Sequence, residues 1–288
     1  MQKSIFVGNG INLLTKSAKS WQDVLRELSA IVGDPSLIDF IDYMPFTLFY
    51  EAVCSGYFKR GEKSDIALKR HIAKLLSSMK HNPFHYQIAK LGLGHIITTN
   101  YDYCLENSIL ADKPLAHDNL RSENRYSVFR RTKINSSYIW HIHGEINKPL
   151  SIMLGNEQYG GHFQKIRTYL TTPNTSPFIA GIRDFEKEKI YSWVDVFLRD
   201  EVHIIGFSLD YSEIDLWGLL SYKSRIQRVS KIQGGQTYYY HWTSKLENNS
   251  DKAKIRLLES LGVKVVKVFD IKDYAKEYEN FIANFKSL

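Results

Sequence analysis

Three side chains that can bind hydroxyl groups or move protons stand at the ends of apolar stretches in this 288-residue sequence. Asn100 and Asp102 follow residues 95–99, whose β-branched run is typical of a buried strand. His143, followed by Gly144, ends a second such run at 137–144. An amide binds hydroxyls and water without adding charge, and an imidazole accepts a proton near neutral pH. The sequence therefore offers groups for proton transfer, provided that the fold brings the strand ends together.

A glycine-containing turn near the N-terminus is a further candidate for ligand binding. The stretch GNGIN at 8–12 follows a short apolar run, and its two glycines would let backbone N–H groups approach an anion. Leu13 stands where the dinucleotide fingerprint has its third glycine, so a tight strand-to-loop turn explains the stretch equally well. The candidate ligand-binding residues here are Gly8, Asn9, Gly10 and Asn12.

A second glycine turn, Gly206-Phe207-Ser208, ends another apolar run and precedes a helix that Asp210 and Glu213 are expected to cap. The Ser208 hydroxyl suits a phosphate or a ribose hydroxyl, although a role in the turn alone would also explain it.

The elements that would position these residues alternate between strands and helices. Apolar strands are expected at 4–8, 95–99, 137–144, 202–208, 237–243 and 263–270, with helices between most of them. This order predicts an α/β fold with a doubly wound, Rossmann-like parallel sheet. Residues 35–91 and 155–199 do not fit the alternation and are interpreted as helical insertions in one domain spanning 1–288. Since ligands bind at the carboxyl ends of such strands, the polar strand ends should converge on one crevice.

Composition limits the class of protein. Hydrophobic residues make up 43% and charged residues 24%, as in globular proteins, and no apolar run reaches the ~18–20 residues of a membrane span. The first strand is expected within four residues of the N-terminus, which leaves no room for a signal peptide. The only cysteines, Cys54 and Cys104, suggest buried thiols in a reducing cytoplasm and cannot form a four-cysteine zinc site.

The net charge and the histidine spacing raise the question of nucleic-acid binding and of metal binding. The net charge of +7 comes partly from basic clusters, which we interpret as solvated helix faces and attraction for an anionic small ligand rather than a nucleic-acid surface. His141 and His143 have a spacing that can bind metal on one strand face, but no carboxylate or third histidine lies nearby in the sequence. No metal is therefore expected.

The motifs at 8–12 and 98–102, His143-Gly144 and Gly206-Phe207-Ser208, in this order, resemble the sirtuin-like superfamily. Within it the chain looks similar to the bacterial sirtuin-like NADases of antiphage defence, from Phe6 to about Phe269. Sirtuin deacylases carry a zinc ribbon and a Gly-Ile-Pro-Asp-Phe-Arg loop. Here there are two cysteines, and LLTKSAKS occupies 13–20. These departures speak against acetyl-lysine chemistry.

The resemblance implies that NAD⁺ binds as a substrate, that no zinc is bound, and that Asn100 and His143 form the catalytic pair. His141 is expected to contribute less to turnover unless it packs under the site. The remaining residues implied in NAD⁺ binding are Gly8, Asn9, Gly10, Asn12, Thr99, Asp102, Gly206, Phe207 and Ser208.

The implied activity is that of an NAD⁺ glycohydrolase acting in antiphage defence. The alternatives are an ADP-ribosyltransferase or deacylase, or a catalytically silent nucleotide-binding subunit. Because a free NADase would deplete its own host, a separately encoded sensor subunit and a homo-oligomer or hetero-complex are expected, with no membrane and no independent DNA binding.

Overall fold

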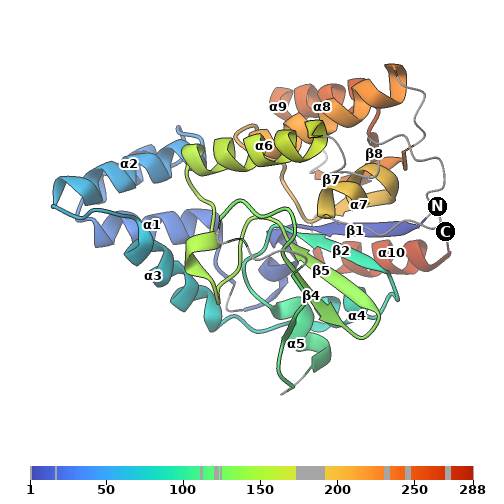
Figure 1. Cartoon of the computed structure of the whole chain (residues 1–288), viewed down its shortest axis with the longest axis horizontal. Helices are drawn as coiled ribbons and strands as arrows, with labels where there is room; N and C mark the ends of the chain where they lie inside the picture. Colours follow the sequence, from blue (N-terminus) through green and yellow to red (C-terminus); the bar gives the residue numbers. More distant parts are fainter. Residues whose placement is uncertain are drawn as a thin grey trace.

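A computed structural model of the chain describes residues 2–16, 18–110, 113–119, 123, 125–172, 192–229, 234–243, 248–269 and 274–287. In this part of the chain eight strands form one sheet, in the order β3-β4-β5-β2-β1-β6-β7-β8, with helices on both faces (Figure 1). The mixed α/β architecture and the Rossmann-like parallel sheet predicted from the sequence are confirmed. No helix among these residues is both long and apolar enough to cross a membrane.

All six predicted strands are present and pair in parallel. They are β1 (Lys3–Val7), β2 (His95–Thr98), β5 (Ser137–His141), β6 (Glu201–Ile205), β7 (Thr237–Thr243) and β8 (Lys264–Phe269). The chain builds outward from β1 through β2 to β5, and then crosses to β6 on the other side of β1. The direction of winding therefore reverses between β1 and β6, which is where a doubly wound sheet opens a crevice.

The antiparallel edge of the sheet was not predicted. The strand β4 (Arg131–Ile134) pairs antiparallel with β5, and the two-residue β3 (Ala116–His117) pairs with β4. Asn135, at φ 52°, forms the tight turn between β4 and β5. Arg131, one of the basic residues that contribute to the net charge of +7, is buried in this part of the sheet, and so is Thr132.

The two stretches interpreted as insertions contain several helices in the part of the chain that the structure describes. The first contains η2 (Pro35–Phe40), α2 (Phe46–Lys59), α3 (Ile66–Ser77) and α4 (Pro83–Ala89). The described residues of the second form α6 (Asn156–Thr171) and α7 (Trp193–Arg199), while residues 173–191 lie outside the described part, and η3 (Pro149–Ser151) precedes this stretch. The other helices are η1 (Asn9–Leu14), α1 (Trp21–Ile31), α5 (Cys104–Leu110), α8 (Ile214–Val229), α9 (Asn249–Ser260) and α10 (Tyr274–Ser287).

The alternation of side chains along β1 divides the core into layers. Phe6 packs with Trp193 and Leu216 on the face covered by α7 and α8, whereas Ile5 and Val7 face the side covered by α4, α5 and α10. A third apolar cluster holds α1, α2 and α3 together as a lobe beside the sheet (Figure 1). The capping box predicted at Ser20 and Asp23 starts α1 of this lobe.

Candidate active site

A cleft of about 620 Å³ opens at the carboxyl ends of the central strands, within the size range of small-molecule sites. It lies against the turns after β1 and β6 and the end of β2, with walls added by the α1–α3 lobe and by β7, α9 and α10. Seven of the residues predicted to bind or act on a ligand line it: Asn9, Gly10, Thr99, His143, Gly206, Phe207 and Ser208.

The two glycine turns pack on each other at the base of the cleft. The Gly10 N–H donates to the Gly206 carbonyl at 2.7 Å, and the Gly8 N–H donates to Ile205 at 3.0 Å. A Cβ atom at Gly8 would lie 2.4 Å from the Gly206 oxygen, and Gly206 itself has a φ of +58°. These glycines permit the close approach of two turns, and the amides of Gly8 and Gly10 donate to carbonyl groups of the fold. A role of Gly8 and Gly10 in ligand binding stays a prediction.

Asn100 lies beside the cleft rather than in its wall. It lines a hollow of about 20 Å³ together with Asp102, and Asn9, Trp21 and Thr99 line both the hollow and the cleft. The Asn100 backbone N–H donates to Thr98 Oγ1 at 3.1 Å, and its side-chain Nδ2 donates to the Gly8 carbonyl at 3.3 Å. A hollow of this size has room for one water molecule. The structure therefore fixes Asn100 between β1 and β2, next to the ligand cleft.

Asp102 and Asn12 form a buried network behind this hollow. Asp102 Oδ1 accepts from the Cys104 N–H at 2.9 Å, at the start of α5, and its Oδ2 accepts from Asn12 Nδ2 at 2.9 Å. Asn12 Oδ1 lies 2.9 Å from His85 Nε2, and burial lowers the pKa of His85 to about 4. Both oxygens of Asp102 thus have partners within the fold. A direct contact of Asp102 or Asn12 with NAD⁺ stays a prediction.

His143 follows the end of β5, where Gly144 turns the chain. Gly144 has a φ of +116°, and a Cβ atom there would lie 2.4 Å from the Ser151 carbonyl oxygen. Only glycine fits this conformation and this close approach, which accounts for the His-Gly pair. The turn brings the His143 side chain to the cleft, where Tyr159 of α6 places its hydroxyl 3.4 Å from Nδ1.

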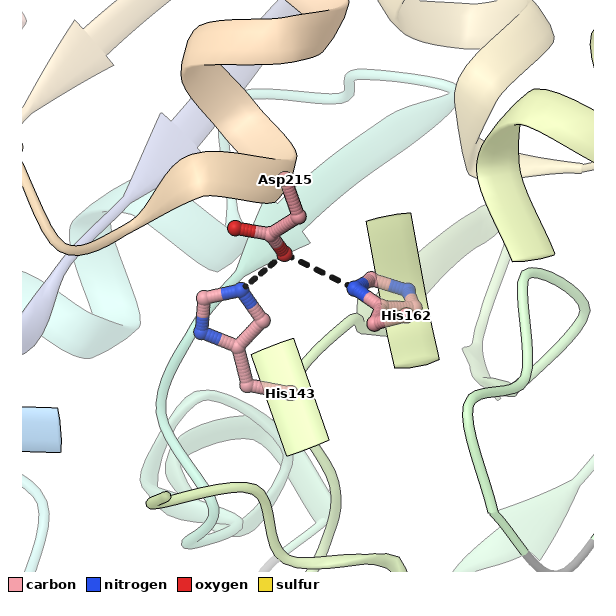
Figure 2. A group of neighbouring side chains, drawn as sticks. All are labelled: His143, His162 and Asp215. Carbon is pink, nitrogen blue, oxygen red and sulfur yellow. Dashed lines mark hydrogen bonds and ion pairs between the residues drawn. The ribbon is translucent and has the colours of Figure 1, made fainter. Parts of the chain in front are cut away.

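The carboxylate of Asp215 lies between His143 and His162 (Figure 2). His143 Nε2 lies 2.9 Å from Asp215 Oδ2, and His162 Nδ1 lies 2.8 Å from the same oxygen. All three side chains are almost completely buried, and they come from the end of β5, from α6 and from α8. Burial would raise the pKa of Asp215, but the two histidines lower it well below its usual range. Asp215 is therefore a charged carboxylate at the back of the site.

Asp215 and His162 were missed by the sequence analysis. It found no carboxylate or third histidine near His143, because these two lie 72 and 19 positions further along the chain. Each stands on the apolar face of its helix, Asp215 four residues before Leu219 and His162 four before Ile166. A polar residue on an apolar helix face was the available signal.

Comparison with protein families matches residues 94–266 to the SIR2-like domain. This range covers more than half of the chain and includes Asn100, His143, His162, Asp215 and the Gly206 turn. The chain belongs to the SIR2-like domain family. Membership indicates an enzyme that uses NAD⁺ and confirms the sirtuin-like resemblance of the sequence. A comparison with curated proteins found no match.

Aromatic and charged residues form the outer wall of the cleft in this SIR2-like domain. Trp21 and Phe46 of the lobe stack at 6.4 Å between ring centroids, and Tyr239 and Trp242 contribute from β7. Lys254 Nζ donates to the Ser208 carbonyl at 2.9 Å, which holds the turn after β6. Flat aromatic faces and a cation beside a hydroxyl are suited to the rings and phosphates of a dinucleotide.

The side chain of His141 contacts different groups from that of His143. Its Nδ1 lies 2.9 Å from the Asn100 carbonyl oxygen, and its Nε2 lies 2.7 Å from Glu106 Oε1, so it packs directly under the Asn100 backbone. The metal spacing considered for the two histidines is therefore not realised. A different group, His143 with His162 and Asp215, has ligand atoms within 4.8 Å of one another, a spacing that metal ions use.

Proposed function

We propose that the protein is an NAD⁺ glycohydrolase that releases nicotinamide and ADP-ribose. The observation that carries this proposal is the pairing of a ligand cleft containing His143 with an adjoining water-sized hollow containing Asn100, at the reversal point of a SIR2-like domain.

The chemistry needs few groups from the protein. The nicotinamide of NAD⁺ is a cationic leaving group, so cleavage of its glycosidic bond needs no general acid. A water must supply the oxygen that bonds to the ribose carbon, while the electron pair of the broken bond goes to the nicotinamide ring. In this proposal His143 takes the proton of that water and later releases it to solvent. The balanced products are nicotinamide, ADP-ribose and one proton.

Asn100 suits the second task, which is to hold that water or a ribose hydroxyl. The Asn100 Nδ2 donates to the Gly8 carbonyl. Among the described residues no hydrogen bond to Asn100 Oδ1 is found, so this oxygen can accept one from a ligand. A neutral amide does this without placing a charge beside a cationic transition state. We propose that Ser208 and Lys254, which line the cleft, contribute to phosphate binding.

Nicotinamide release from NAD⁺ by the purified protein tests the proposal. Asn100→Ala and His143→Ala should each abolish release, whereas Asn107→Ala and His71→Ala, outside the cleft, should retain it. Equal release with and without an added protein acceptor supports hydrolysis. Transfer of ADP-ribose to the acceptor would refute the proposal. It would also be refuted if the wild type binds NAD⁺ but does not cleave it with any candidate activator.

The biological role that we propose is an effector of antiphage defence whose activity is gated. An ungated NADase would deplete the NAD⁺ of its own cell, so we propose control by a separately encoded sensor or regulatory subunit within an oligomer. Full-rate hydrolysis by the isolated protein, without partner or ligand, would contradict this gating.

A further inference from the structure

The surroundings of His143 fix which of its ring nitrogens carries the hydrogen. Asp215 Oδ2 lies 2.9 Å from Nε2, and a charged carboxylate can only accept a hydrogen bond, so Nε2 must donate. On the other side of the ring, the Tyr159 hydroxyl lies 3.4 Å from Nδ1. Burial raises the pKa of Tyr159 well above 10, so this hydroxyl keeps its proton and can donate to the Nδ1 lone pair.

His162 completes the arrangement from behind. Its Nδ1 donates to the same Asp215 oxygen at 2.8 Å, and the Leu216 N–H donates to Asp215 Oδ1 at 2.9 Å. Burial lowers the pKa of His162 although Asp215 opposes this, so His162 is a neutral donor and leaves the charge of Asp215 uncompensated until His143 gains a proton. Its Nε2 is buried and has no hydrogen-bond partner in the described part of the chain.

We propose that Asp215 is the positioning residue of the site, held in place by His162: it keeps His143 in the Nε2–H tautomer, aims the Nδ1 lone pair at the cleft, and stabilises the imidazolium that forms when Nδ1 takes a proton. This inference rests on the proposed glycohydrolase reaction for its role in turnover. Its tautomer assignment stands on the geometry of Asp215, Tyr159 and His143 alone. Such a carboxylate–imidazole pair works in serine proteases with the two ring nitrogens exchanged.

Asp215→Asn is the decisive substitution because it keeps the shape and changes the hydrogen-bond pattern. Leu216 still requires an acceptor, which turns the new amide nitrogen toward the two histidines. His162 can adapt at little cost, since its unpartnered Nε2 can carry the hydrogen instead. His143 must then move its hydrogen to Nδ1 and lose the lone pair that faces the cleft. We expect nicotinamide release to fall by about 10²–10⁴-fold, with the Kd for NAD⁺ changed less than about threefold.

Two-bond ¹H–¹⁵N spectra of protein with ¹⁵N-labelled histidine report the tautomer directly, and they do not require the enzyme to be active. The His143 signals, assigned from their loss in His143→Gln, should show the Nε2–H form in the wild type and the Nδ1–H form in Asp215→Asn. His162→Phe keeps the Asp215 carboxylate, so it should keep the wild-type tautomer and lose about tenfold in rate, the equivalent of one hydrogen bond. Glu201→Gln, at the His203–Glu201 pair on the opposite end of β6, is the matched control and should behave as wild type.

An Nδ1–H tautomer in the wild type, or an Asp215→Asn protein with unchanged tautomer and rate, overturns the inference. Stoichiometric zinc that shifts the His143 signals on removal also overturns it, because Asp215 would then be a metal ligand. If the wild type shows the Nε2–H form and still fails to cleave NAD⁺ under every condition, the glycohydrolase proposal fails and the tautomer assignment holds. If Asp215→Asn does not fold, the wild-type spectrum and His162→Phe decide the question.

Discussion

Replacing His141 by glutamine should remove a buried positive charge that supports Asn100. Both ring nitrogens of His141 face acceptors, the Asn100 carbonyl at 2.9 Å and Glu106 Oε1 at 2.7 Å. An imidazole can donate from both nitrogens only when it is protonated. Burial would lower the pKa of His141, but the Glu106 carboxylate outweighs this and raises it to about 9. His141 is therefore an imidazolium at neutral pH.

The direction and size of the effect on stability follow from this pKa. The folded protein holds the proton more tightly than the unfolded chain, in which a histidine titrates near 6.5. The stabilisation is fully present below about pH 6.5 and is lost as the pH rises through about 9. The difference between the folded and unfolded pKa values of His141 corresponds to about 3 kcal/mol. Lys223 acts in the opposite direction over part of this range, because burial lowers its pKa to about 7. The contribution of His141 to the pH dependence of stability is therefore obtained from a comparison with a variant that lacks it.

Urea unfolding of the wild type and His141→Gln between pH 6 and 10 provides that comparison. The difference in unfolding free energy should be largest at pH 6 and should shrink by about 3 kcal/mol toward pH 10. Glu106→Gln should remove the same pH dependence, since it removes the charge that holds the proton. A difference that does not vary with pH would refute the assignment of an imidazolium. Because His141 packs under Asn100, we also expect slower nicotinamide release from His141→Gln, although the sequence alone gave it the smaller role.

Variants at Asn100, His143, Asp102 and Gly144 provide further tests. The double variant Asn100→Ala/His143→Ala should cleave NAD⁺ no more slowly than either single variant, because the two residues act on one water and one ribose; additive losses in kcat would contradict this. Asp102→Ala should lower the unfolding free energy by about 1 kcal/mol or more, because the buried Cys104 N–H at the start of α5 loses its acceptor, and Asp102→Asn should be closer to wild type in urea. Gly144→Ala should lower it by about 3 kcal/mol or more, since φ is +116° and Ser151 blocks the Cβ; a melting temperature equal to wild type would show that the turn relaxes.

The parts of the fold set by local pattern could be predicted from the sequence. All six parallel strands and the Ser20 capping box follow from short-range periodicity and turn chemistry, and strand ends in a parallel sheet must share one edge. That geometric rule placed Thr99, His143 and Ser208 around one cleft although they are far apart in the chain. The β3–β4 edge was not predicted because β3 has only two residues and β4 only four, and the buried residues of β4 include the polar Arg131 and Thr132 on opposite faces, so no apolar alternation is visible.

The pairing of buried polar groups could not be predicted in the same way. An apolar stripe identifies the buried face of a helix, but it does not say which distant residue satisfies a polar side chain placed within that stripe. Asp215 on α8 and His162 on α6 interrupt such stripes, as does the pair of Glu106 on α5 and His141 on β5. A buried charge without a partner costs several kcal/mol, so each interruption implies a partner on another element. Both pairs lie directly behind a predicted catalytic residue. In this protein, polar residues that interrupt an apolar pattern therefore support the site.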